Sequence, residues 1–130
     1  MNIFRHLLSC YPLTLLCLGL VWYLSLFIDM PETPMDDLPF IDKWTHLVMY
    51  GGACSAMWWE YGRCHSRLIA WKLVLFAWIG PVLMSGLIEL LQKYCTTTRS
   101  GEWLDFASNT IGVTLAVPIG LIFWHWRRSR

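Results

Sequence analysis

The feature that most constrains this chain is a run from Leu7 to Ile28 that contains no Asp, Glu, Lys or Arg. A helix needs about 20 apolar residues to cross the hydrocarbon core of a bilayer, so the run predicts a membrane-spanning helix. A signal peptide is the alternative, because Arg5 and His6 give the run a basic start. We favour the span, since the run is longer than a typical signal-peptide core and no small-x-small cleavage pattern follows it.

The rest of the chain is similarly apolar. Of its 130 residues, 56% are hydrophobic and 15% are charged, whereas ordinary soluble domains carry about 25% charged residues. We therefore expect one all-α domain over residues 1–130, a bundle of four transmembrane helices. The expected spans are about 7–28, 39–61, 68–92 and 104–126. Gly80-Pro81 should kink the third span, because proline removes a helical hydrogen bond.

The distribution of basic residues predicts the orientation of these spans. Short cytoplasmic loops carry an excess of Lys and Arg. Most of the ten Lys and Arg residues fall on one side of the expected membrane, namely Arg5, Arg63, Arg67, Lys72, Arg127, Arg128 and Arg130. Both termini should then be cytoplasmic. The net charge of +1 indicates no basic face for nucleic acid.

Polar residues inside the expected spans share one face at one end of each helix. They are, in chain order, Asp42, Lys43, His46 and Tyr50, then Glu89 and Gln92, then Asp105 and Asn109, whose face continues to Gly112. Arg99 lies in the loop beside them. A charged side chain at a helix centre costs about 2.5–3.5 kcal/mol on insertion scales, so such residues must be paired or hydrated. We expect a shared polar pocket at the extracytoplasmic ends of the helices, with Gly112 allowing close helix approach.

These polar residues have two other interpretations. They could be ion pairs that only fix the register of the helices, although buried charges stabilise membrane bundles poorly. His46, Glu89 and Asp105 could instead form a metal site with one imidazole and two carboxylates. Because Lys43 and Arg99 would compete for those carboxylates, and because no H-E-x-x-H pattern is present, we expect neither a metal nor another cofactor.

Three motifs in this order resemble the VanZ-like family of small bacterial membrane proteins. They are DKWTHLVMY at 42–50, ELLQ at 89–92 and RSGEWLDFASNTIG at 99–112, and the resemblance covers roughly residues 40–116. It implies a multi-pass protein of the bacterial cytoplasmic membrane, in a family whose name member is associated with teicoplanin resistance. One departure is Ala116, where the family tends to have a second glycine one turn after the first.

The pocket suggests two functions of different classes. The first is binding of a polar or anionic lipid-linked ligand, such as a cell-envelope precursor. Lys43 and Arg99 would contact its phosphate or carboxylate, and His46 would be a titratable donor. The second is a membrane enzyme acting on such a lipid, with His46 and either Glu89 or Asp105 as acid and base. We rank the enzyme second, because the sequence offers no evident nucleophile.

Overall fold

A computed structural model describes residues 2–27, 41–95 and 103–130 of the chain. Within these residues all regular secondary structure is helical, so the expected all-α class is confirmed for them. The elements are α1 (Ile3–Cys10), α2 (Pro12–Leu26), α3 (Ile41–Cys64), α4 (Ala70–Leu73), a π-helical segment (Val74–Ile79), α5 (Gly80–Cys95) and α6 (Trp103–Arg128).

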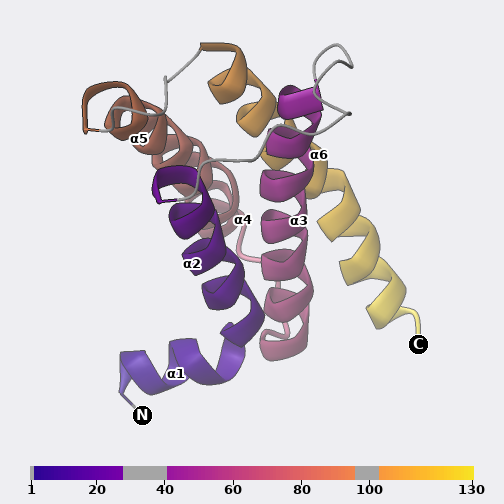
Figure 1. The fold of residues 1–130 in the computed structure, drawn as a ribbon. Coiled ribbons are helices and arrows are strands. Elements are labelled where there is room, and N and C mark those ends of the chain that lie inside the picture. The colour runs from indigo at the N-terminus through magenta and orange to yellow at the C-terminus, as the bar shows by residue number, and fades with distance from the viewer. Residues whose placement is uncertain (1, 28–40, 96–102) are drawn as a thin grey trace.

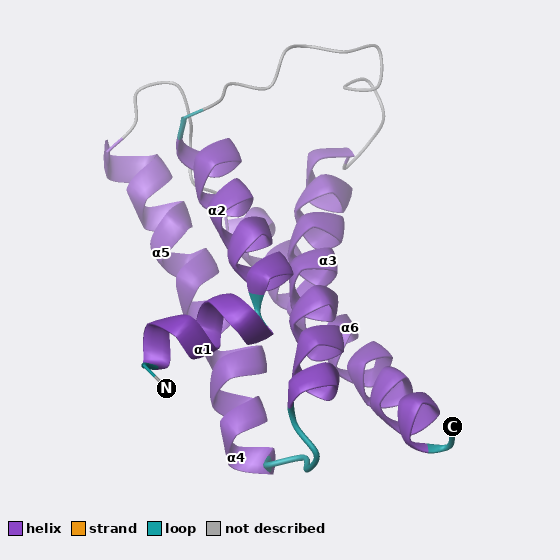
Figure 2. Ribbon diagram, turned by 90° about the horizontal axis from the view of Figure 1, so that it is seen from below, coloured by secondary structure: helices purple, strands orange, loops and turns teal. Residues whose placement is uncertain are grey.

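Four long helices form a closed ring in which each one packs against two neighbours. The order around the ring is α2, α3, α6 and α5, and α3 has its most extensive packing against α6. Figure 1 shows these helices running lengthwise side by side, with both ends of the chain at the same end of the bundle. Figure 2, which is turned by 90° about the horizontal axis, shows α1 lying across the bundle rather than along it.

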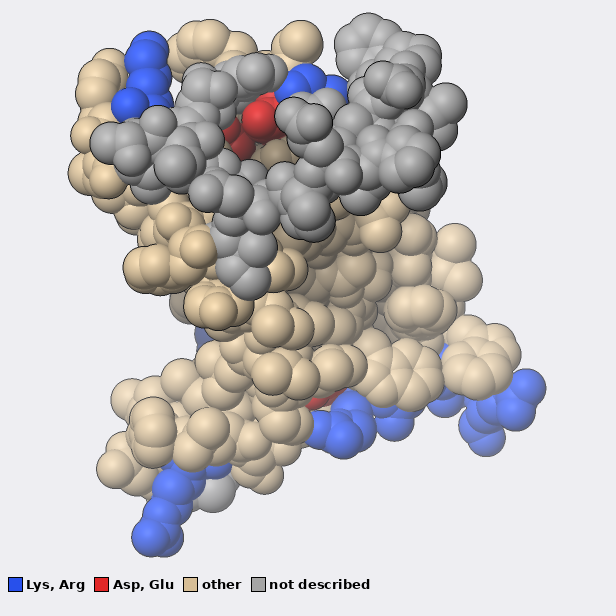
Figure 3. Space-filling model, in the orientation of Figure 1, with Lys and Arg blue, Asp and Glu red and all other residues tan. Residues whose placement is uncertain are grey.

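Two helices are long and apolar enough to cross a membrane, by length and composition. They are the continuous helix Ala70–Cys95, which includes α4 and α5, and α6. The bent pair α1 and α2 would make a third if it is one broken span. Helix α3 has 24 residues, which is long enough, but it is not apolar enough to be counted with them. Figure 3 shows the corresponding surface, a broad uncharged belt with basic side chains gathered mainly at one end.

The expected first span over 7–28 is interrupted near its start. Helices α1 and α2 meet at an angle of 89°, and Tyr11 between them has φ −127° and ψ 41°, outside the helical region. The cause is Pro12 at the first position of α2. Proline disfavours a helical conformation in the residue before it but suits the first turn of a helix. Residues 7–10 therefore belong to α1, and α2 alone has 15 residues.

At Gly80-Pro81, where the sequence predicts a kink, the preceding turn is π-helical and the helix continues beyond it. The Gly80 N–H donates to the Leu75 carbonyl, five residues back, which is the pattern of a π-helix. Pro81 has no N–H to donate, and its ring crowds the carbonyl four residues earlier. The turn before it is wider for that reason, and the helix continues to Cys95.

Helices α3 and α6 approach closely because glycines line their contact. A Cβ built on Gly112 would collide with the Leu47 carbonyl and lie 3.1 Å from the Gly51 nitrogen. This confirms the expectation for Gly112. Two turns later a Cβ on Gly120 would collide with the Trp58 ring. Ala116, between these two glycines, is completely buried, so the alanine at this position still packs in the core.

Candidate functional site

The polar faces predicted on α3, α5 and α6 meet in one buried cluster. The Lys43 Nζ lies 2.6 Å from Asp105 Oδ1, and the His46 Nε2 lies 3.8 Å from Asp105 Oδ2. On its other side, His46 Nδ1 is 3.1 Å from Asn109 Oδ1. Asn109 in turn donates from Nδ2 to Glu89 Oε1 at 3.5 Å. The predicted convergence of these five residues is therefore present, with Asn109 at its centre.

The cluster holds its carboxylates away from solvent. Asn109 is 0% exposed, and Glu89 and Asp105 are each 7% exposed. Removing two carboxylates from water is costly unless cations or hydrogen-bond donors compensate them. Lys43 supplies a cation to Asp105, and the Asn109 amide supplies a donor to Glu89. The cluster is thus a paired polar site.

Gln92 extends the polar region to α2. Its Nε2 donates to the Ser25 carbonyl at 2.7 Å, and the side chain is buried. Ser25 lies in the last turn of α2, where carbonyls have no partner within the helix. Gln92 therefore satisfies the end of α2, a structural contact that its place among the predicted ligand-binding residues did not anticipate.

Tyr50 lies on the same face of α3 as His46, one turn further on. Its side chain is 1% exposed, and its hydroxyl has no hydrogen-bond partner among the described residues. The Glu89 carboxylate is close enough to act on it electrostatically. Two other predicted site residues fall where the structure gives no account: the Asp42 side chain and the whole of Arg99 lie outside the described residues.

An apolar groove between α5 and α6 reaches the cluster. Its volume is about 440 Å³. Its lining consists of Val82, Leu83, Gly86, Leu87, Glu89, Leu90, Lys93, Trp103 and Phe106. Glu89 is therefore shared by the buried cluster and the wall of the groove. Lys93, one helical turn beyond Glu89, adds a cation to the lining.

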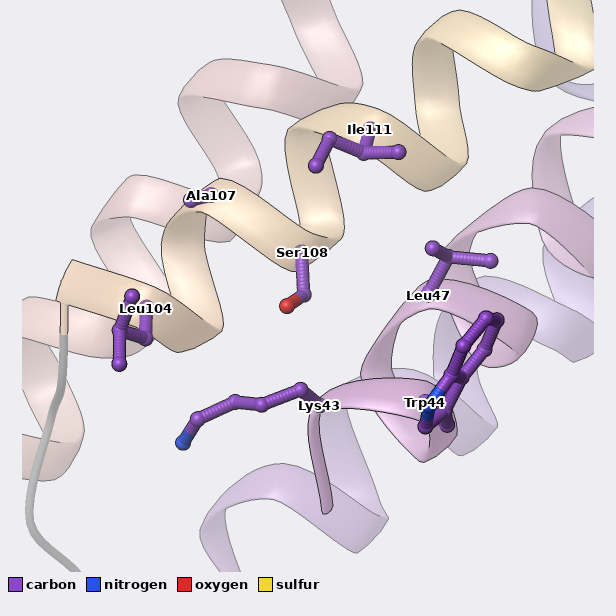
Figure 4. A pocket seen from close by; sticks show the side chains of 7 residues that line it. All are labelled: Lys43, Trp44, Leu47, Leu104, Ala107, Ser108 and Ile111. Atoms are coloured by element: carbon purple, nitrogen blue, oxygen red, sulfur yellow. The ribbon is translucent and has the colours of Figure 1, made fainter. Parts of the chain in front are cut away.

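A second groove, of about 330 Å³, lies between the first turns of α3 and α6. Figure 4 shows Lys43 extending from α3 toward the start of α6, between Leu104 and Trp44, with the Ser108 hydroxyl facing the same space. Because Lys43 also pairs with Asp105, it borders both this groove and the polar cluster. A change at Lys43 would therefore affect both.

Glu60 is a buried carboxylate that the sequence analysis did not single out. It is 2% exposed and accepts hydrogen bonds from the Leu13 N–H at 2.7 Å, the Thr14 N–H at 2.9 Å and the Thr14 hydroxyl at 2.6 Å. Helix α2 has no side-chain cap of its own, so Glu60 from α3 takes that role. In the sequence, Pro12 indicates where this helix starts. No residue around Pro12 indicates that Glu60 accepts hydrogen bonds from the first turn.

Three residues of the cluster bring together side chains of the types that bind metal ions. His46, Glu89 and Asp105 each offer one ligand atom, and these atoms lie within 4.8 Å of one another. Imidazole nitrogen and carboxylate oxygen are common ligands of divalent ions. The competition expected from Lys43 is present at Asp105, where Nζ lies 2.6 Å from Oδ1.

The chain matches no protein-family model, and it matches no curated protein and no solved structure. The similarity to the VanZ-like family is therefore a hypothesis based on its three motifs. Function is inferred from the geometry of the cluster and its grooves.

Proposed function

We propose that this is a multi-pass protein of the bacterial cytoplasmic membrane that binds the polar or anionic head of a lipid or lipid-linked envelope precursor. The observation that carries the proposal is the position of Glu89, which belongs both to the buried cluster and to the wall of the apolar groove. A ligand with a polar head and an apolar chain needs both environments at one place. A site that only fixed helix register would need no such groove.

The groove suits the apolar part of such a ligand. Leu83, Leu87 and Leu90 line it, and between 49% and 68% of the surface of each is exposed. In a bilayer these side chains would face the lipid chains, so a ligand could enter from the side. Gly86 lets the Phe106 ring pack closely against α5 in this lining, since a Cβ there would come within 3.3 Å of the ring.

The charges suit the head. Lys93 is exposed beside the groove, and Lys43 borders the cluster, so both could contact phosphate or carboxylate. We propose the same role for Arg99. Glu89 and Asn109 would bond hydroxyl or amide groups of the head.

The proposed topology has four spans, formed by α2, α3, the helix Ala70–Cys95, and α6. The basic end of the bundle, which includes Arg63, Arg127 and Arg128, would face the cytoplasm. The polar cluster would then lie near the outer leaflet. A lipid-linked precursor or the acyl tail of teicoplanin would meet it there, which fits a role in the cell envelope and the teicoplanin resistance associated with the family's name member.

A second candidate function is catalysis on the same ligand. It is favoured by His46, which Asn109 orients through Nδ1 and which directs Nε2 toward Asp105. An imidazole held in this way is suited to act as a general base, with Glu89 or Asp105 as its acid partner. The cluster contains no hydroxyl or thiol within hydrogen-bonding distance of His46 among the described residues, so binding is the better supported function.

Lipid retention tests the proposal. The full chain is purified in mild detergent, and bound lipid is quantified by mass spectrometry before and after adding undecaprenyl phosphate. A charge-assisted hydrogen bond contributes about 1.5–3 kcal/mol, so Lys43→Ala should weaken retention roughly ten- to a hundredfold. Leu87→Trp, which fills the groove without touching the charges, should also weaken it.

Two control variants make the result interpretable. Lys72→Ala removes a lysine near the opposite end of the bundle and should leave retention unchanged. Ile122→Trp adds the same bulk to an exposed position of α6 and should also have no effect. Retention that is equal in wild type, Lys43→Ala and Leu87→Trp would overturn the proposal. A His46→Gln variant that keeps its lipid but has lost the protection that the intact protein gives to cells would favour the enzyme instead.

A further inference from the structure

We propose that His46, Glu89 and Asp105 bind a divalent transition-metal ion. Each contributes one ligand atom, and these atoms lie within 4.8 Å of one another. Metal–ligand distances of about 2.0–2.2 Å place the ligands of one ion roughly 3–3.5 Å apart, so only small side-chain movements would close the site. The residues come from α3, α5 and α6, and an ion would tie these helices together.

Metal-binding histidines usually donate a hydrogen bond from the ring nitrogen that does not bind the metal. His46 has a partner for such a bond. His46 Nδ1 is 3.1 Å from Asn109 Oδ1, and the Asn109 amide nitrogen is directed to Glu89. The imidazole must therefore donate from Nδ1, which leaves Nε2 facing Asp105 Oδ2 at 3.8 Å. This distance is too long for a hydrogen bond. A neutral imidazole and a carboxylate would face each other with lone pairs, an arrangement that a cation between them stabilises.

The Tyr50 hydroxyl is an independent indication that this cluster holds a further polar group. Its hydroxyl is buried within electrostatic range of Glu89 and has no hydrogen-bond partner among the described residues. Leaving a buried hydroxyl unpaired costs about 1–3 kcal/mol. A water molecule held by an ion in the cluster would be a suitable partner for the hydroxyl.

Lys43 and the metal can share Asp105. Lys43 uses Oδ1 at 2.6 Å, whereas Oδ2 faces His46. The Asp105 oxygen that faces His46 is thus not the one that Lys43 contacts at 2.6 Å.

The ligand set indicates the class of ion. One imidazole with two carboxylates suits Mn²⁺, Fe²⁺ or Zn²⁺ better than Ca²⁺, which prefers an all-oxygen site. Three protein ligands would leave positions open for a phosphate or carboxylate oxygen. That role in holding an anionic head rests on the proposed function, whereas binding of the ion itself does not.

The test is a titration of the full chain with Mn²⁺, after treatment with a chelator and removal of lipid in detergent. Free Mn²⁺ is followed by electron paramagnetic resonance. We expect saturable binding of a single ion per chain. Loss of an outer partner costs about 10- to 100-fold in metal affinity, so Asn109→Ala should weaken binding by that factor, and His46→Ala should weaken it at least as much. The matched control His125→Ala changes an exposed histidine near the end of α6 and should leave affinity unchanged.

A second measurement does not depend on the folding of any variant. The electron spin-echo envelope of Mn²⁺ on the wild-type chain should show coupling to one imidazole nitrogen. Absence of that coupling, absence of binding at millimolar Mn²⁺, or equal affinity in wild type and His46→Ala would each overturn the metal site. Because no lipid is present, such a result would leave the Lys43 dependence of lipid retention as a separate test of the proposed function.

Discussion

At the scale of single residues, periodicity predicted much of the candidate site. The positions of His46, Asp105 and Asn109 follow from helical spacing, because residues one turn apart share a face. The partner of Gln92 could not be predicted in this way, since the Ser25 carbonyl comes from another helix. Glu60 could not be predicted for the same reason, because its partners are the backbone N–H groups of Leu13 and Thr14 and the Thr14 hydroxyl, all on α2.

Removing the Glu60 carboxylate should destabilise the bundle. Glu60→Ala leaves the N–H groups of Leu13 and Thr14 without their acceptor in a buried place, and the expected loss is about 2–3 kcal/mol of unfolding free energy. Reversible unfolding of the purified chain in mixed detergent, followed by circular dichroism, measures it. Thr14→Val removes only the hydroxyl donor and should cost about 1 kcal/mol. Equal stability of Glu60→Ala and wild type would show that the cap contributes nothing.

At the scale of elements, composition predicted where helices lie better than it predicted their interruptions. The uncharged run predicted one helix over 7–28. Within this run, however, one helix ends just before Pro12 and another begins at Pro12. Pro81 stands in a similar apolar context and only widens its helix. The difference is local: Tyr11 has left the helical region, whereas Gly80 remains helical and finds an acceptor five residues back.

The contact between α3 and α6 predicts opposite results for two glycines. Alanine raises helix propensity by about 1 kcal/mol at either position. At Gly112 the new Cβ would meet the Leu47 backbone, and forced overpacking costs about 1–3 kcal/mol. At Gly52 nothing lies within 4 Å. In the same unfolding assay Gly112→Ala should be less stable than Gly52→Ala, and the reverse order would mean that the two helices do not pack as described.

At the scale of the whole molecule, the two ends of the bundle differ in chemistry. One end holds the α3–α5–α6 cluster, where the described carboxylates Glu89 and Asp105 are buried beside Lys43. The other end holds most of the described basic residues, with Arg128 donating to the Ser66 carbonyl. Figure 3 shows an uncharged surface between these ends. A bilayer would cover that surface and leave the cluster at one leaflet, open sideways through the groove between α5 and α6.

Photo-crosslinking from that groove tests the central claim most directly. A photoreactive residue is placed at Leu87 in the groove, and separately at Ile122 and Phe76, which are exposed on α6 and on the π-helical segment. After irradiation of intact membranes, the attached lipids are identified by mass spectrometry. Position 87 should capture an anionic lipid or lipid-linked precursor enriched over the bulk membrane, and Lys43→Ala should abolish that enrichment. The same bulk lipid composition at all three positions, unchanged by Lys43→Ala, would contradict a specific lipid site.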